Sequence, residues 1–370
     1  MKAETKALHT RIDIDGSDPV VTPIFQASAF QSTSPYFYTR NNNPNIAELE
    51  EVVRTLESTN FAIATTTGMS AITLVLSLLK HGETLVINKD IYGCSYKLMQ
   101  QFTERIGVKL IISDLSIEEN IDRLEKVDMV LFETPTNPFL KTIPISYVAE
   151  KVKANNKNAL VVVDNTWASP LFQHPCEIGA DISLHSATKY FSGHSDIMGG
   201  VILMDDEKLH QKVKDLRFYY GAILAPQSAW LLRRSLQTFG IRMRAHQKTT
   251  LVMRDFLETI PEIEKVYYPK LDEKQLNGYA TLLFFDLKKD RVKHYPEFAK
   301  NLELFDTGTG MACVTSMIAQ PYTGSHASMN SEEKESMGLK DSLIRLSFGL
   351  EDVEDLKNDL EKGFESLRKF

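Results

Sequence analysis

The chain has 370 residues, 43% of them hydrophobic, which is enough for a large buried core and for two domains. Its formal net charge at pH 7 is −7, with acidic and basic residues interspersed, so a nucleic-acid or anionic-membrane partner is excluded. No apolar run approaches the roughly 20 residues of a membrane span. Three dispersed cysteines, Cys94, Cys176 and Cys313, exclude a disulfide framework and a CxxC metal site.

The N-terminal segment is predicted to be an arm. Residues 1 to about 45 are irregular and rich in Ser, Thr, Asn and Pro, so they bury little by themselves and should lie across another surface. The first residues are charged and lack the apolar core of a secretory signal. We therefore expect a cytoplasmic protein.

Short apolar segments then alternate with helical patterns. Helices are expected over residues 68–79 and 145–152. Fully apolar strands separated by helices indicate an α/β fold with a mainly parallel, seven-stranded sheet covered by helices on both faces. The expected strands are residues 61–65, 84–87, 108–112, 128–133, 160–164, 182–184 and 200–204.

The pattern changes after Pro226. A long helical stretch runs to about residue 260, with an interruption near Gly240. Strands are expected near Val266 and over residues 281–286, and a closing helix with one apolar stripe follows from Glu351. We expect a smaller C-terminal α+β domain, giving three parts: arm 1–45, α/β domain 46–240 and C-terminal domain 241–370.

The richest chemistry lies at Ser186-Ala187-Thr188-Lys189, read together with Asp164. Two hydroxyl groups beside a lysine provide phosphate donors next to an amine that can form a Schiff base. Asp164 closes the apolar strand of residues 160–163, where a carboxylate is unfavourable without a cationic partner. A protonated pyridine nitrogen is such a partner. These parts together predict a site for pyridoxal 5′-phosphate (PLP), used as an electron sink.

Other strand ends add candidates at the same sheet edge, where ligands bind in open α/β sheets. Thr67-Gly68-Met69 opens a helix whose free N–H groups suit a phosphate, although an ordinary strand-helix turn has the same pattern. Tyr92 could stack on an aromatic cofactor or be a half-buried surface tyrosine. Asn137 could bond the cofactor's ring oxygen or belong to a proline-bounded turn.

Two other ligand classes are disfavoured. His174, Cys176, His185 and His194 have spacings that fit no common zinc-ligand pattern, so no metal is expected. No GxGxxG follows an expected strand, which argues against a nicotinamide-binding Rossmann enzyme.

The order and spacing of the motifs resemble the Cys/Met-metabolism, or transsulfuration, family of PLP enzymes, which includes cystathionine γ-synthase, the cystathionine lyases and methionine γ-lyase. The resemblance runs from about Thr22 to the C-terminus. The matching pieces are Tyr38-Thr39-Arg40, Asn43-Pro44, Gly68-Met69, Tyr92-Gly93, Glu133 to Pro138, Asp164-Asn165-Thr166, Ser186 to Lys189, Gly193 to Asp196, Gly199-Gly200, Arg242-Met243, His246, His326 to Ser328, and Ile344 to Ser347.

The resemblance implies PLP fold type I, the aspartate-aminotransferase type, usually as a tetramer built from two catalytic dimers. Lys189 would hold the cofactor and move protons, Tyr92 would stack on the ring and act near the leaving group, and Arg345 would bind the substrate carboxylate. Tyr38 and Arg40 would reach the phosphate from a neighbouring subunit. The remaining implied cofactor-binding residues are Gly68, Met69, Asn137, Asp164, Thr166, Ser186 and Thr188.

Substrate-reading positions depart from the family. Phe37 stands where several cystathionine-handling members have an acid, and Lys97 where some have arginine. Thr309-Gly310 replaces a pair that usually ends in serine. Phe37 together with Cys94 is similar to methionine γ-lyase, although a cysteine there is also an ordinary small core residue.

We therefore expect β- or γ-elimination on a small sulfur amino acid or O-activated homoserine. The alternatives are γ-replacement, as in cystathionine γ-synthase or O-acylhomoserine sulfhydrylase, and a non-catalytic relative that binds PLP.

Overall fold

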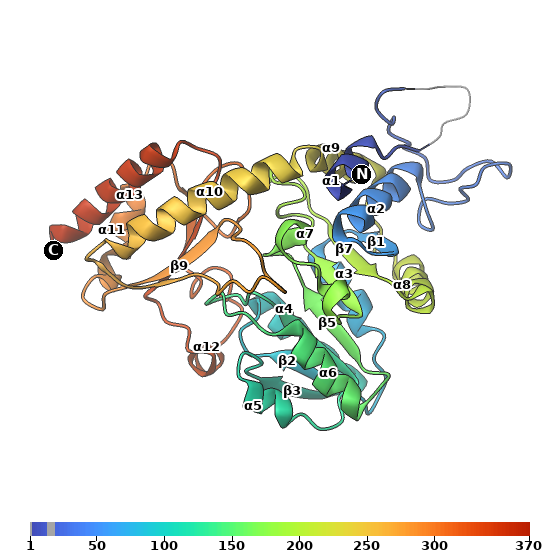
Figure 1. The fold of residues 1–370 in the computed structure, drawn as a ribbon, viewed down its shortest axis with the longest axis horizontal. Helices are drawn as coiled ribbons and strands as arrows, with labels where there is room; N and C mark the ends of the chain where they lie inside the picture. The colour runs from blue at the N-terminus through green and yellow to red at the C-terminus, as the bar shows by residue number, and fades with distance from the viewer. Residues whose placement is uncertain (1, 13–18) are drawn as a thin grey trace.

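The computed structural model describes residues 2–12 and 19–370, which form two sheets with their helices (Figure 1). The large sheet has the strand order β1-β7-β6-β5-β4-β2-β3, and only β7 runs antiparallel to its neighbours. Its strands are β1 (Phe61–Thr65), β2 (Thr84–Asn88), β3 (Lys109–Ser113), β4 (Met129–Glu133), β5 (Leu160–Asp164), β6 (Ile182–His185) and β7 (Gly200–Met204).

Alternating side chains of the central strands face two different layers of helices. Val130 and Phe132 of β4 pack with α5 and α6, whereas Leu131 between them packs with α2, α3 and α4. Both faces are therefore buried, which explains why these strands are apolar throughout. The helices are α2 (Pro44–Glu57), α3 (Gly68–Leu76), α4 (Gly93–Ile106), α5 (Glu118–Asp122), α6 (Ile145–Asn155), α7 (Ser169–Phe172), α8 (Glu207–Tyr220) and α9 (Pro226–Leu236), with a 3₁₀ turn at Pro175–Ile178.

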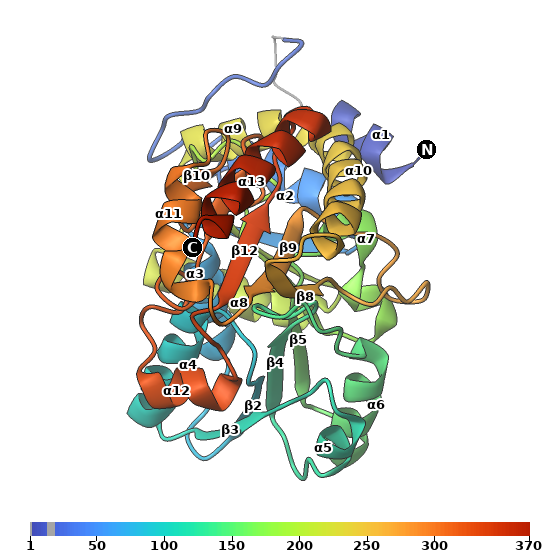
Figure 2. The same cartoon turned by 90° about the vertical axis from the view of Figure 1, so that its left-hand side faces the viewer.

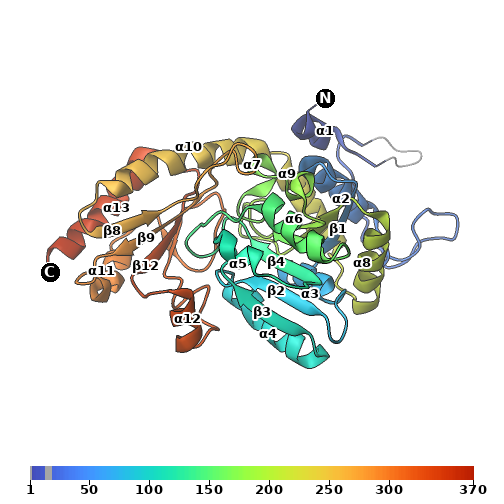
Figure 3. The same cartoon turned by 60° about the horizontal axis from the view of Figure 1, so that its bottom comes forward.

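The second sheet lies on the other side of the molecule, with its own apolar core (Figures 1 and 3). Its strand order is β10-β11-β12-β9-β8, and only the short β10–β11 pair is parallel. The strands are β8 (Ile263–Tyr267), β9 (Leu282–Leu287), β10 (Asp306–Thr307), β11 (Met317–Ala319) and β12 (Leu343–Ser347). The helices are α10 (Phe239–Glu258), α11 (Tyr295–Lys300), α12 (Ser331–Met337) and α13 (Val353–Arg368), with a 3₁₀ turn at Val292–His294.

Figure 2 shows how helices surround this sheet while α12 extends to the side of α4. The α12–α4 contact includes an ion pair between Lys97 Nζ and Glu333 Oε1 at 2.5 Å. The long helical stretch after Pro226 is two helices, α9 and α10, separated at residues 237–238. In the described part of the chain, every helix is too short or too polar to cross a membrane.

The N-terminal arm is less irregular than expected. Residues Ala3–His9 form helix α1, so the expectation of irregular structure there is wrong. This helix contacts α2, its Ala7 is buried, and Glu4 pairs with Arg244. A seven-residue helix is unstable alone, so tertiary packing supplies the stabilisation that the local sequence does not signal. Residues 13–18 of the expected arm lie outside the described residues.

Candidate active site

The candidate residues gather where the parallel strands of the large sheet end. β1, β2, β4, β5 and β6 all point the same way, so their carboxyl ends share one edge. The segments that leave this edge contain, in chain order, Gly68, Met69, Tyr92, Cys94, Asn137, Asp164, Thr166, Ser186, Thr188 and Lys189. The topology therefore brings together side chains that are more than a hundred residues apart in sequence.

Asp164 is fixed by the turn that follows it. Its Oδ1 accepts hydrogen bonds from the Thr166 backbone N–H at 3.0 Å and from the Thr166 hydroxyl. The same hydroxyl oxygen accepts a bond from the Ser186 N–H at 2.8 Å, which ties the end of β5 to the end of β6. Burial raises the pKa of Asp164, while the bonds from Thr166 and the charge of His185 oppose that shift.

The Ser186 to Lys189 turn packs against the start of α3. A Cβ placed on Gly68 would lie 2.9 Å from the Ser186 Cβ, so this close approach requires glycine. Thr188 Oγ1 accepts a hydrogen bond from the Gly199 N–H at 3.0 Å. Lys189 follows, and burial together with the nearby charge of Arg345 lowers the pKa of its amine.

Tyr92 follows β2 and contacts Glu133 at the end of β4. Its backbone N–H donates to Glu133 Oε1 at 3.0 Å, and its phenol is close to Cys94 and Glu133. Burial, then the hydrogen bond with Cys94, raises the pKa of Tyr92 to about 12. The Asn137 Oδ1 is buried and has no hydrogen-bond partner in the described part of the chain. Such an atom indicates a missing polar partner.

Glu133 is a site residue to which the sequence analysis gave no role. Its carboxyl group is buried beside Asp164, and burial, then the charge of Asp164, raises the pKa of Glu133 well above its ordinary value. The signal was available, because Glu133 closes the apolar strand Met129–Phe132 as Asp164 closes its own strand. A protonated Glu133 avoids two adjacent buried negative charges.

Arg345 approaches from the second sheet. It sits on β12, its side chain is 3% exposed, and Nη2 donates to the Thr309 carbonyl at 3.1 Å and the Gly310 carbonyl at 2.6 Å. Its Nε atom is buried without a partner among the described residues. Burial lowers the pKa of Arg345 to about 10, an effect opposed by Tyr92. Thr309 and Gly310 therefore contact the site through backbone carbonyls.

Three predicted residues lie on the arm instead. Phe37 is 75% exposed and Tyr38 is 37% exposed. Arg40 donates from Nη1 to the Phe218 carbonyl at 3.1 Å, and its guanidinium lies 4.1 Å from the centre of the Phe218 ring. Within the described residues, no hydrogen bond joins these three to Lys189 or its neighbours.

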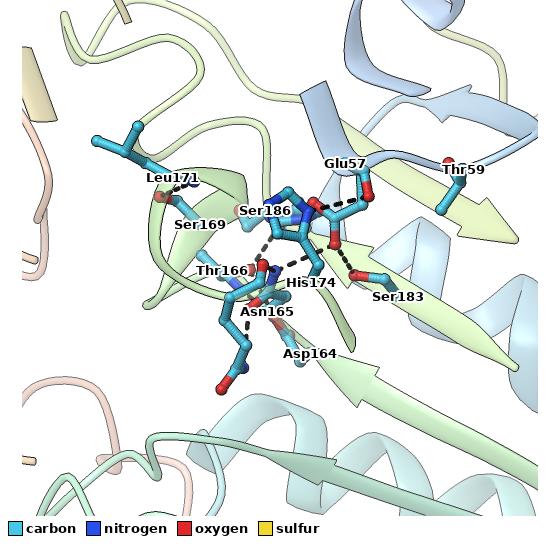
Figure 4. A network of polar contacts seen from close by, with 12 residues as sticks. Glu57, Thr59, Asp164, Asn165, Thr166, Ser169, Leu171, His174, Ser183 and Ser186 are labelled. Carbon is cyan, nitrogen blue, oxygen red and sulfur yellow. Dashed lines mark hydrogen bonds and ion pairs between the residues drawn. The ribbon is translucent and has the colours of Figure 1, made fainter. Parts of the chain in front are cut away.

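A second buried network lies behind Asp164 (Figure 4). The Glu57 carboxylate at the end of α2 accepts hydrogen bonds from the Ser183 hydroxyl and, at 3.1 Å, from the Asn165 amide. Its other oxygen lies 3.0 Å from His185 Nε2, and the two side chains are 0% and 2% exposed. The sequence analysis missed this network, because Glu57 lies in a helical pattern far from every motif.

Comparisons with known proteins agree with this geometry. A family model described as "Cys/Met metabolism PLP-dependent enzyme" matches residues 4–365. The chain is 35% identical over 381 residues to a cystathionine β-lyase of Lactococcus lactis, covering 98% of each sequence. It is 36% identical over 388 residues to an L-methionine γ-lyase of Fusobacterium nucleatum, again covering 98% of each. A cystathionine γ-synthase structure from Xanthomonas oryzae superimposes with a TM-score of 0.94 at 33% identity, over 100% of this chain and 99% of that chain.

Proposed function

Because this chain belongs to the Cys/Met-metabolism family of PLP-dependent enzymes, we propose that it is a lyase acting on a sulfur-containing amino acid or O-activated homoserine. The proposed reaction removes the α-proton and then eliminates a β- or γ-substituent. PLP supplies the electron sink that accepts the electron pair left at the α-carbon. The predictions of a PLP cofactor and of PLP fold type I are confirmed by the family match and by the superposition.

The strand-end residues fit this cofactor. Asp164 Oδ2 accepts no hydrogen bond from the described residues and is free for a protonated ring nitrogen. Asn137 lies at the same sheet edge with its Oδ1 buried, and its amide N–H would donate a hydrogen bond to the ring oxygen. Gly68 lets the Ser186 turn pack closely against the N-terminus of α3, where backbone N–H groups favour an anion. We assign the phosphate to Gly68, Met69, Ser186 and Thr188, and we assign Thr166 to holding Asp164.

The presence of Lys189 and Arg345 in one buried site is the observation that carries the proposal. Arg345 would bind the substrate's α-carboxylate through N–H groups that its two carbonyl partners leave free. Lys189 lies close enough for the Arg345 charge to lower the pKa of its amine. An amine with a lowered pKa beside the carboxylate site loses its proton more readily, and it is positioned to take the α-proton and return it elsewhere. Tyr92 is protonated at neutral pH, because its pKa is raised to about 12, and would donate to the leaving group.

The residues expected to contact the far end of the substrate favour a substrate without a second charged group there. Phe37, supplied by a neighbouring subunit, is apolar and offers no partner for a distal ammonium group. The Lys97 ammonium is already paired with Glu333 at 2.5 Å, so it offers little to a distal carboxylate. Cys94, Thr309 and Gly310 would complete the wall around a small thioether or ester.

We further propose that the arm acts between subunits. Tyr38 is exposed, and Arg40 is held beside it by Phe218, so both are available to a second copy of the chain. They would reach the phosphate of the neighbouring site in a dimer, with two dimers forming a tetramer. Sedimentation of the wild-type and Arg40→Ala proteins, with and without PLP, tests this assembly.

γ-Replacement is the second candidate function, favoured by the superposition on a cystathionine γ-synthase. Such an enzyme uses the same α-proton removal but needs an added thiol to give product. A non-catalytic relative is disfavoured by the presence of Lys189, Tyr92 and Arg345 in one site.

A substrate panel tests these proposals. Methionine, cysteine, cystathionine, O-acetylhomoserine and O-succinylhomoserine would be assayed for 2-oxo acid release, with and without an added thiol, and products identified by mass spectrometry. We expect 2-oxo acid without thiol, and Lys189→Ala serves as the inactive control. If product forms only when thiol is added, the proposal of elimination is wrong and γ-replacement is the function. No product from any substrate by the PLP-loaded protein would overturn both.

A further inference from the structure

We propose that Glu57 is a positioning residue for the cofactor site: its buried contacts with His185 and Asn165 hold the strand ends on either side of the site, so that Asp164 is kept as an oriented carboxylate. The inference rests on the proposed pairing of Asp164 with the ring nitrogen of PLP, and the Asp164→Asn variant in the experiment below tests that pairing separately. Glu57 itself touches neither cofactor nor substrate in this scheme.

The position of Glu57 is unfavourable for a carboxylate that has only a structural role. Its side chain is 0% exposed, and burying a charge costs free energy unless partners compensate for the lost hydration. Glu57 is also the last residue of α2, where the helix dipole disfavours negative charge. A leucine or glutamine would avoid both penalties. The carboxylate is therefore best explained by what its negative charge does to its neighbours.

Those neighbours flank the cofactor-binding residues on two adjacent strands. Asn165, which donates to Glu57 Oε1, directly follows Asp164 at the end of β5. His185, which faces Glu57 Oε2, directly precedes Ser186 at the end of β6. One carboxylate thus holds both strand ends, and Figure 4 shows Glu57 with its contacts to Asn165 and Ser183.

The same contacts act on the charge of Asp164. Glu57 holds the His185 ring through the 3.0 Å contact at Nε2, and the charge of His185 opposes the effect of burial on the pKa of Asp164. On its other side Asp164 faces Glu133 of β4, which needs no cation when it is protonated. Two other titratable groups lie near Glu57. His174 Nδ1 lies 3.1 Å from the Glu57 carbonyl oxygen, and the pKa of Cys176 is raised by burial first and then by the charge of Glu57.

Glu48 provides a matched control. It is also a buried glutamate of α2 with a buried basic partner, since its Oε1 lies 3.2 Å from Arg233 Nε. Its partner Arg233 lies on α9 and donates to carbonyls of the N-terminal segment. Glu48→Gln therefore removes a buried charge from the same helix without touching Asn165 or His185.

The experiment compares Glu57→Gln, Glu48→Gln and Asp164→Asn with the wild-type protein. PLP is titrated into each apoprotein to give Kd, the absorption band of the bound cofactor is followed against pH, and thermal unfolding reports folding. We expect Glu57→Gln to raise the Kd for PLP by roughly 10- to 100-fold, the size found for outer partners of metal ligands. The pH below which the cofactor is released should rise, because the His185 charge that opposes the raised pKa of Asp164 is no longer held in place.

Glu48→Gln should lower the unfolding temperature and leave Kd and the absorption profile unchanged. If Glu57→Gln binds PLP within twofold of wild type while Asp164→Asn binds weakly, the inference is wrong and the role of Asp164 survives. If Asp164→Asn also binds normally, the proposed ring-nitrogen pairing itself fails. Equal weakening by Glu48→Gln and Glu57→Gln would reduce the effect to general destabilisation and overturn the inference. Should Glu57→Gln not fold, His185→Gln enters the same comparison with the same expected shift.

Discussion

Arg345→Ala gives the sharpest test of the substrate site. The substitution removes a guanidinium that is 3% exposed and that reaches the Lys189 site from a different sheet. Its two hydrogen bonds to the Thr309 and Gly310 carbonyls are also lost. Thr309 is exposed, so water replaces its lost bond, and removing a buried cation relieves a burial penalty. We therefore expect a change of less than about 2 kcal/mol in the free energy of unfolding.

The catalytic effect should be much larger. Truncating one member of a buried, hydrogen-bonded charge pair costs about 2–5 kcal/mol. With 1.36 kcal/mol per factor of ten, this corresponds to a loss of about 30- to 5,000-fold in kcat/KM. Because the substrate carboxylate is bound before and during the reaction, most of the loss should enter through KM.

The assay is steady-state kinetics on the best substrate of the panel, with PLP affinity and unfolding measured on the same preparation. Arg345→Lys is the matched variant, since it keeps the charge but not the planar fork, and it should recover only part of the activity. A kcat/KM within fivefold of wild type for Arg345→Ala, with normal KM, would refute the carboxylate role. Loss of PLP binding would instead assign Arg345 to the cofactor.

Three further predictions follow from the site. Tyr92→Phe keeps the stacking ring and removes the hydroxyl, so kcat should fall by roughly 10²–10⁴ with PLP affinity nearly unchanged; equal loss in both measurements contradicts a proton-transfer role. In the apoprotein, the pKa of Lys189 is lower in the folded than in the unfolded chain, so the unfolded chain binds more protons. The free energy of unfolding should therefore rise with pH up to the ordinary lysine pKa. Denaturant titrations across pH should show this rise for the wild type and not for Lys189→Met. Gly200→Ala would push a Cβ into the Thr67 carbonyl and should lower the free energy of unfolding by about 1–3 kcal/mol or more. The control is Gly221→Ala, where the backbone is left-handed but the surrounding space is open; it should lower the free energy of unfolding by roughly 1–2 kcal/mol, less than Gly200→Ala does.

The strands of the large sheet were predictable because each is short, apolar and closed by a turn. The segment 160–164 was assigned from its valines alone, and the structure has β5 over the same residues. The helix Ala3–His9 was not predictable, since seven residues cannot hold a helix without the surface of α2. The interruption expected near Gly240 is a break at residues 237–238, between the end of α9 and the start of α10.

The chemistry was also largely readable. Lys189 with its preceding hydroxyls, and Asp164 after three valines, are local patterns that indicate PLP without any three-dimensional information. Glu133 has the same local signal, a carboxylate that closes an apolar strand. Glu57 has no such signal, because a glutamate in an amphipathic helix normally faces water, and only its contacts with Asn165, Ser183 and His185 show that it is buried.

The sequence by itself thus determined the cofactor and the family, because both depend on residue types at fixed short spacings along single strands and turns. Only the tertiary structure decided which distant groups meet: Arg345 beside Lys189, Glu133 beside Asp164, and Glu57 against His185. These contacts depend on strand order and on how the second sheet packs against the first. Local propensity does not encode either, since both are set by burying apolar faces contributed by the whole chain.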